Sequence, residues 1–289
     1  MELRVLRYLL IVAREENITR AAELLHISQP TLSRQLMQLE EELGVKLFQR
    51  GKHNVYLTSE GSLFRRRAQE IVNLADRAAD EMKQEDELLT GTISIGCGEL
   101  RSMNELSEMI VAFHARYPFV KFEIHSAYNI DIKERIEQGL LDIGLLVEPV
   151  EIAKYDFVRM QTTENWGVLV REDSHLAGKK VVYPQDLSDV PLIMSRNELS
   201  QNELSSWFGN YVQGIELFST YNLLYNGAMV LRKKGGAVLC LDLEAKYDGL
   251  HFIPLEPPLT FHSVLAWKDK QAYSRATNEF IQFVKKFKK

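Results

Sequence analysis

The sequence predicts a multi-domain protein with a small helical domain that ends in a β-hairpin, one long helix, and an α/β domain of two lobes. In the first 58 residues, apolar residues recur at helical spacing and are followed by two short apolar runs around a glycine. Residues 59–89 contain no proline, and their single glycine, Gly61, lies near the start, which predicts a continuous helix. From residue 90 onward, short apolar runs alternate with amphipathic segments, which is typical of α/β folds.

The composition indicates a soluble protein of the cytoplasm. The chain has 289 residues, of which 45% are hydrophobic and 26% charged, and its net charge of −5 gives no sign of a nucleic-acid partner. A surface for DNA would therefore depend on local placement of Arg and Lys. Cys97 and Cys240 are too far apart to suggest a disulfide framework. Arg4, Arg7 and Arg14 interrupt the apolar N-terminus, so we expect no signal peptide, and no apolar run is long enough to span a membrane.

Three helices are expected before residue 45. The first ends near Glu15, and Thr19 is expected to cap a short second helix. Ser28 is a good N-cap for the third helix, Pro30 is tolerated in its first turn, and Gly44 ends it. The face of this third helix that must be buried consists of Leu32, Leu36, Leu39 and Leu43.

The opposite face of the third helix carries Gln29, Pro30, Ser33, Arg34 and Met37. A helix fits the major groove of DNA, where Gln and Arg read base edges and Ser or Thr contact bases or phosphates. Such residues near the start of the second helix of a pair are typical of a helix-turn-helix. The alternative at this point is an ordinary solvated helix face.

Residues 45–58 predict a β-hairpin that turns between Gly51 and Asn54. Its tip carries Arg50, Lys52 and His53. A basic hairpin after a recognition helix is a wing that contacts phosphates or the minor groove. An exposed hairpin tip can also be basic without any such role.

Together these residues resemble the winged helix-turn-helix domain of LysR-type transcriptional regulators, without a gap over residues 1–61. The matching positions are Ala21, Ala22, Leu24, Ser28, Gln29, Pro30, Ser33, Leu39, Glu40, Leu43, Gly44, Leu47, Phe48, Arg50, Leu57, Thr58 and Gly61. The resemblance implies that promoter DNA is contacted by a set of residues from the second helix, the third helix and the wing. That set is Thr19, Gln29, Pro30, Thr31, Ser33, Arg34, Arg50, Lys52 and His53.

The long helix of residues 59–89 is expected to pair two copies of the chain. Its apolar residues alternate by four and three, which indicates a heptad seam. The seam consists of Phe64, Ala68, Ile71, Ala75, Ala78 and Met82. LysR-type proteins have a similar linker helix, and a dimer suits a two-fold DNA site, with a tetramer as a further expectation. The alternative is that this seam packs on the chain's own core. The run of arginines at 65–67 on the same helix is expected to be a solvated face, with direct contact to DNA as the alternative.

The remaining residues, 90–289, resemble the two-lobed, periplasmic-binding-protein-like effector domain of the same family. Lobe I is expected to comprise about residues 90–161 and 266–289, and lobe II about residues 162–265. The expected strands are 92–98, 120–126, 141–147, 166–170, 192–194, 215–218, 237–241 and 264–267. The expected helices are 100–116, 131–138, 204–211, 221–232 and 273–287.

A small-molecule effector is expected where strands end and helices begin, because ligands of open α/β folds bind there. The candidate residues are Glu99, Arg101, Ser102, Ser126, Asn129, Ser195 and Thr220. Hydroxyl groups and helix N-termini suit a small anion, although such residues are often only helix caps. Relatives often place hydroxyl residues where this chain has Glu99 and Arg101, which makes a cationic or zwitterionic effector an alternative.

No catalytic or metal site and no cofactor are expected, because the histidines are scattered and no glycine-rich phosphate loop is present. Redox sensing through Cys97 and Cys240 is an alternative to their being buried apolar residues. The sequence thus predicts a LysR-type regulator that binds promoter DNA, itself, RNA polymerase and a small effector. The competing classes are a ligand-binding protein whose helical domain serves association, and an enzyme.

Overall fold

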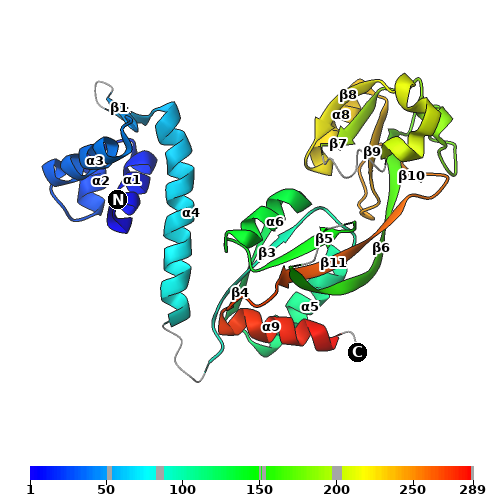
Figure 1. The fold of residues 1–289 in the computed structure, drawn as a ribbon. Coiled ribbons are helices and arrows are strands. Elements are labelled where there is room, and N and C mark those ends of the chain that lie inside the picture. The colour runs from blue at the N-terminus through cyan, green and yellow to red at the C-terminus, as the bar shows by residue number, and fades with distance from the viewer. Residues whose placement is uncertain (51–53, 83–87, 150, 152–153, 197–203, 288–289) are drawn as a thin grey trace. The chain divides into compact units, whose positions relative to one another are not determined.

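The computed structural model describes residues 1–50, 54–82, 88–149, 151, 154–196 and 204–287, and it divides the chain into two compact units (Figure 1). Unit 1 is Met1–Glu85 and unit 2 is Asp86–Lys289. Each unit has its own hydrophobic core. The long helix belongs to unit 1, while both lobes of the α/β region belong to unit 2.

Unit 1 contains three short helices, a two-stranded hairpin and one long helix. Its elements are α1 (Leu3–Glu15), α2 (Ile18–Leu24), α3 (Gln29–Leu43), β1 (Phe48–Arg50), β2 (Val55–Leu57) and α4 (Ser59–Met82). The hairpin is antiparallel, with Phe48 opposite Leu57 and Arg50 opposite Val55. The predicted helix order and hairpin are therefore present in the structure.

Local capping signals account for two of the helix ends as predicted and correct a third. The Ser28 side chain accepts a hydrogen bond from the Thr31 N–H at the start of α3, and Gly44 ends this helix in the left-handed conformation at φ 69°. The cap of α2 is Asn17, whose side chain accepts from the Arg20 N–H at 3.0 Å. The prediction of Thr19 as the cap was wrong, because the helix begins before it, at Ile18.

Helix α4 presents two apolar faces, and the predicted seam is divided between them. Ala68 and Val72 are buried in the core of unit 1, and Phe64 packs against that core. Ile71 is 41% exposed and Leu74 42% exposed. Ala68 therefore packs on the chain's own core, which corrects its assignment to a dimer seam, whereas Phe64 is only half-buried and its place in the seam stays a prediction. Spacing alone identifies an apolar face but not the element that covers it.

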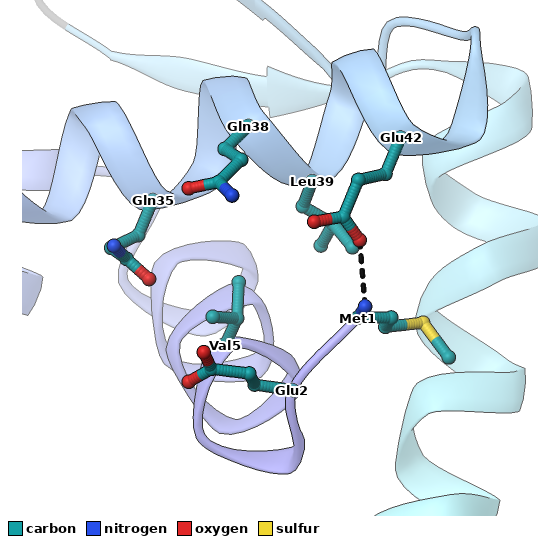
Figure 2. A pocket seen from close by; sticks show the side chains of 7 residues that line it. All are labelled: Met1, Glu2, Val5, Gln35, Gln38, Leu39 and Glu42. Atoms are coloured by element: carbon teal, nitrogen blue, oxygen red, sulfur yellow. Dashed lines mark ion pairs between the residues drawn. The ribbon is translucent and has the colours of Figure 1, made fainter.

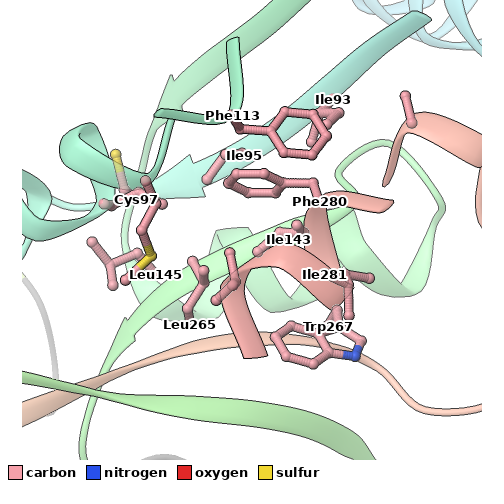
Figure 3. Packing of buried hydrophobic residues seen from close by; sticks show 14 of the residues in the cluster. Ile93, Ile95, Cys97, Phe113, Ile143, Leu145, Leu265, Trp267, Phe280 and Ile281 are labelled. Carbon is pink, nitrogen blue, oxygen red and sulfur yellow. The ribbon is translucent and has the colours of Figure 1, made fainter. Parts of the chain in front are cut away.

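In lobe I of unit 2, a mixed sheet is covered on both faces by helices. Its elements are β3 (Gly91–Cys97), α5 (Met103–Arg116), β4 (Val120–Ser126), α6 (Asn129–Glu137), β5 (Ile143–Val147), β11 (Thr260–Lys268) and α9 (Arg275–Phe287). Strand β3 pairs in parallel with β4 and β5, whereas β11 is antiparallel to β5. The aromatic side chains of α5 and α9 meet over β3, with the rings of Phe113 and Phe280 5.1 Å apart (Figure 3). Helix α6 packs on the opposite face through Ile132 and Ile136.

Lobe II continues the same sheet through one long strand. Its elements are β6 (Tyr155–Arg171), η1 (Pro184–Leu187), β7 (Leu192–Ser195), η2 (Gly209–Gly214), β8 (Leu217–Tyr221), α8 (Leu224–Lys234), β9 (Ala237–Leu241) and β10 (Leu250–Pro254). The order β4-β3-β5-β11-β6-β9-β7-β8, with β10 on β6, makes one nine-stranded sheet. Strand β6 begins well before the predicted residue 166, and β10 was not predicted. Because β6 serves both lobes, their cores are joined by a continuous strand.

Candidate nucleic-acid interface and effector site

The predicted recognition face of α3 lies on the surface of unit 1. Gln29, Pro30 and Arg34 are exposed, and Ser33 is half-buried. The Gln29 Nε2 donates a hydrogen bond to the Ser33 Oγ at 2.9 Å, one helical turn further on. This bond links two of the predicted DNA-contacting residues, and their contact with DNA stays a prediction.

Glu40, on the buried side of α3, fixes the base of the wing to the recognition helix. Its Oε1 accepts hydrogen bonds from the backbone N–H groups of Leu47 at 2.8 Å and Phe48 at 3.1 Å. Its Oε2 pairs with the Lys46 Nζ at 2.7 Å. Burial alone would raise the pKa of Glu40, but the Lys46 and backbone hydrogen bonds outweigh it, and the pKa lies below its ordinary value. Sequence reasoning matched Glu40 to the family but missed this role.

Thr58 joins the wing to α4. Its Oγ1 donates to the Lys46 carbonyl at 2.7 Å and accepts from the Gly61 N–H at 2.9 Å. A side chain at Gly61 would bring its Cβ within 2.0 Å of the Leu47 carbonyl oxygen, so only glycine allows α4 to start this close to the hairpin. The wing therefore has a rigid base.

The structure describes only some of the other residues that are predicted to contact DNA. Thr19 is exposed in the first turn of α2, and Thr31 is half-buried in the first turn of α3. Arg50 ends β1, while Lys52 and His53 lie outside the described residues. In the 65–67 run, Arg67 pairs with Glu70 at 2.9 Å on α4. DNA contact by each of these residues stays a prediction.

Unit 1 also has a small surface pocket between the start of α1 and the second half of α3 (Figure 2). Its floor is apolar, from Val5 and Leu39, and the Met1 ammonium group pairs with Glu42 at its edge at 2.7 Å. None of the residues that line it belongs to the predicted recognition set.

The predicted effector residues follow the ends of strands in both lobes, as expected, but several already have partners. Ser126 ends β4 beside Cys97 of β3, and Ser195 ends β7 beside Tyr221 of β8. Asn129 is buried, and its side chain bonds both backbone groups of Val147, at 2.8 and 3.2 Å. It therefore joins α6 to β5 and is not available to a ligand.

Ser102 and Thr220 differ in their exposure. Thr220 is exposed near the end of β8, opposite Met194, and α8 begins at Leu224. Ser102 is fully buried before α5, and its Oγ has no hydrogen-bond partner among the residues that the structure describes. The Ser102 hydroxyl is thus a buried polar group with unused capacity.

The N-terminus of α5 is occupied by a carboxylate of the chain itself. Glu164 of β6 is fully buried and accepts from the N–H groups of Arg101 at 2.8 Å and Ser102 at 2.9 Å. The predicted anion site at this helix is therefore corrected. The sequence did not indicate Glu164 as its occupant, because Glu164 is 62 residues away from Ser102 in sequence. An effector anion would find these two N–H groups already satisfied.

Three side-chain contacts connect the ends of strands in lobe I to lobe II. The Glu99 Oε2 accepts from the Leu224 N–H at 2.5 Å, and the Tyr128 hydroxyl donates to the Tyr221 carbonyl at 2.7 Å. Arg101 forms an ion pair with Glu244. Glu99 and Arg101 were predicted at this site, whereas Tyr128 was not.

Cysteine and metal chemistry find little support in the geometry. Both thiols are buried in different cores, and burial raises the pKa of the Cys97 thiol and of the Cys240 thiol. Within the described part of the chain, no group of three His, Cys, Asp or Glu side chains is placed to hold a metal ion. No helix among the described residues has the length and apolar character needed to cross a membrane.

Comparison with known proteins matches both units. Residues 3–62 match the family of bacterial regulatory helix-turn-helix proteins of the lysR type, and residues 86–288 match the LysR substrate binding domain. The regulator BsdA of Bacillus subtilis is 33% identical over 68% of this chain and 67% of its own length. HcaR of Escherichia coli, an operon activator, is 37% identical over 67% of this chain and 64% of its own length.

The fold agrees with solved structures of the same family. The crystal structure of CbnR, a LysR family regulator, aligns with this chain over 100% of both chains. The TM-score is 0.74 and the sequence identity is 21%. CbnR bound to its target DNA has a TM-score of 0.71 at 19% identity over 99% of both chains. At these identities the likeness shows the fold alone, while the family matches extend over both units. The chain therefore belongs to the LysR family of bacterial transcriptional regulators.

Proposed function

We propose that this regulator binds promoter DNA through the N-terminal half of α3 and the wing, and that a small molecule between the two lobes modulates this binding. The family consists of transcriptional regulators and not of enzymes. The observation that carries the proposal is the polar surface made by the exposed Gln29 and Arg34 and the half-buried Ser33. It lies on a helix whose other side is fixed to the wing by Glu40. A module used only for association has no need of such a polar face.

The proposal includes a homodimer and, through a second surface, a tetramer. The exposed apolar residues of α4, including Leu63, Ile71 and Leu74, favour pairing with a second copy of this helix. The edge strands β4 and β8 of the nine-stranded sheet also expose apolar side chains, including Ile124 and Phe218. Light scattering of an Ile71→Glu, Leu74→Glu variant is expected to show a smaller assembly than the wild type.

Other parts of the proposal follow from the DNA partner. The protein would act in the cytoplasm, where the promoter is, and would contact RNA polymerase there. The effector would alter the DNA complex only by binding two states of the protein with different affinities. No cofactor takes part in the proposal.

DNA upstream of the protein's own gene, titrated at several salt concentrations, tests the proposal. Arg34→Ala and Ser33→Ala are expected to weaken site-selective binding by about tenfold, within the range of one lost base contact. Gln38→Ala, exposed on the later part of α3, is the matched control and is expected to bind as the wild type does. Equal binding to random DNA, or unchanged binding by both variants, would contradict the assignment and favour the ligand-binding alternative.

A further inference from the structure

The row of residues that begins with Gln29 and Ser33 on α3 continues to Met37. Residues four positions apart on a helix are neighbours on its surface. The bond from the Gln29 Nε2 to the Ser33 Oγ, at 2.9 Å, joins the first two members of this row, and Met37 lies one turn beyond Ser33. Arg34, three positions before Met37, lies next to it on the same side. Met37 therefore extends the predicted recognition face towards the end of α3.

Met37 is a large apolar side chain on an otherwise polar surface. Every residue of α3 is described by the structure, and among its large apolar side chains only Met37 is exposed, at 47%. Leu32, Leu36 and Leu39 are buried in the core of unit 1, whereas Met37 is outside that core. An apolar side chain that stays in water adds little to the stability of the fold. A partner that covers Met37 would gain the free energy that folding does not.

The neighbours of Met37 limit where such a partner can lie. Gln38 is on the side of α3 that lines the small pocket next to α1 (Figure 2). Glu40 is buried against the base of the wing. Glu41, one turn beyond Met37, is exposed, and its negative charge is unfavourable near the phosphates of DNA. The part of α3 that suits DNA therefore ends with Met37.

The chemistry of the major groove gives an apolar side chain a defined partner. Hydrogen-bonding side chains, such as those of Gln29, Ser33 and Arg34, read the polar edges of the bases. The C5 methyl group of thymine forms no hydrogen bond and is read by apolar contact. The first residues of a recognition helix lie closest to the bases, so a residue in the middle of the helix needs a long side chain. Methionine is unbranched, has three rotatable bonds and adapts to irregular surfaces.

We propose that Met37 is a specificity-determining residue that contacts the C5 methyl group of a thymine in the major groove of the promoter site. The inference rests on the proposed binding of DNA by α3, and it adds an apolar contact to the predicted polar set. The contact favours thymine at one position of the site, because the other three bases carry no such methyl group.

Replacement of thymine by deoxyuridine tests this contact, because it removes only the methyl group. The full-length protein is titrated with DNA upstream of its own gene in which each thymine is replaced in turn. At the thymine that Met37 contacts, the replacement is expected to weaken binding about fourfold, as the loss of one buried methyl group implies. Met37→Gln has a similar length but a polar end, so it is expected to lose about fourfold in affinity for the unmodified DNA. It should also be insensitive to deoxyuridine at that position.

Two control variants separate the apolar contact from other effects of the substitution. Met37→Leu stays apolar and is expected to keep the sensitivity to deoxyuridine. Gln38→Ala is the matched control, because Gln38 is the exposed neighbour that faces the pocket, and it should keep the sensitivity in full. A contact to a base leaves the number of phosphate contacts unchanged, so Met37→Gln should have the wild-type slope of affinity against salt concentration.

The outcomes distinguish this inference from the proposed function. Site-selective binding by the wild type, with no thymine whose deoxyuridine effect depends on Met37, would overturn the inference and leave the proposed function in place. A shallower salt slope in Met37→Gln, or loss of the deoxyuridine effect in Gln38→Ala, would overturn it as well. Equal binding of the wild type to random DNA would instead contradict the proposed function, and the contact of Met37 with thymine would fall with it.

Discussion

Replacement of Glu40 by alanine is expected to destabilise unit 1 selectively. The carboxylate is almost fully buried and accepts two backbone hydrogen bonds, from Leu47 and Phe48, as well as the ion pair with Lys46. Alanine would leave both N–H groups at the base of the wing without their acceptor. Hydrogen bonds to charged groups contribute about 1.5–3 kcal/mol each, so with partial access of water we expect a loss of about 3 kcal/mol. The exposed Lys46 pair adds little to this value.

The three tryptophans make the measurement selective, because Trp166, Trp207 and Trp267 all lie in unit 2. In urea, tryptophan fluorescence therefore follows unit 2, while circular dichroism also follows the helices of unit 1. Glu40→Ala is expected to move only the dichroism transition to lower urea. Glu41→Ala, its exposed neighbour on α3, is the control and should leave both transitions in place.

The same variant gives a pH dependence of known sign. The pKa of Glu40 in the folded protein lies below its ordinary value of 4.5, so its stabilising contribution is complete above that value and is lost as pH falls through the folded-state pKa. The difference between wild type and Glu40→Ala should therefore shrink below pH 4.5. A difference that stays constant, or a fluorescence transition that moves with the dichroism, would refute the account of Glu40.

Three further outcomes are expected. Gly61→Ala should destabilise unit 1 by about 3 kcal/mol or more in urea, because the new Cβ would lie 2.0 Å from the Leu47 carbonyl oxygen. A loss of stability below about 1 kcal/mol would contradict this close approach. Glu164→Ala should destabilise unit 2 by about 3 kcal/mol in the fluorescence transition, since two buried N–H groups lose their acceptor, and an unchanged midpoint would contradict it. Cys97 and Cys240 should resist iodoacetamide in the native protein at neutral pH, because burial raises both thiol pKa values, whereas rapid labelling followed by mass spectrometry would revive the redox alternative.

The sequence predicted unit 1 well because its signals are local. Ser28 and Gly44 lie at the two ends of α3 and set its bounds, and both have the expected capping geometry. The cap of α2 was missed by two residues because Asn17 and Thr19 are both good caps, and only the backbone decides between them. The residues of the predicted α4 seam lie on two different faces of the helix. The sequence did not show this, because apolar spacing does not tell whether Ala68 faces its own core or a second chain.

The effector site was less predictable because its partners are distant in sequence. In lobe I, β4 has the predicted bounds of Val120–Ser126 and β5 ends at the predicted Val147, whereas β3 ends one residue earlier than predicted, at Cys97. No local pattern shows that Glu164 caps α5 or that Glu99 reaches Leu224. These contacts depend on how β6 and α8 return to the ends of β3, which is a property of the tertiary fold.

The carboxylates of Glu164 and Glu99, which both lie at helix N-termini, differ in their exposure to solvent. Glu164 is fully buried, so its departure would leave the Arg101 and Ser102 N–H groups without a partner from protein or solvent. Glu99 is exposed, so water can take its place at the Leu224 N–H. Loss of the Glu164 carboxylate is therefore expected to cost unit 2 more stability than loss of the Glu99 carboxylate.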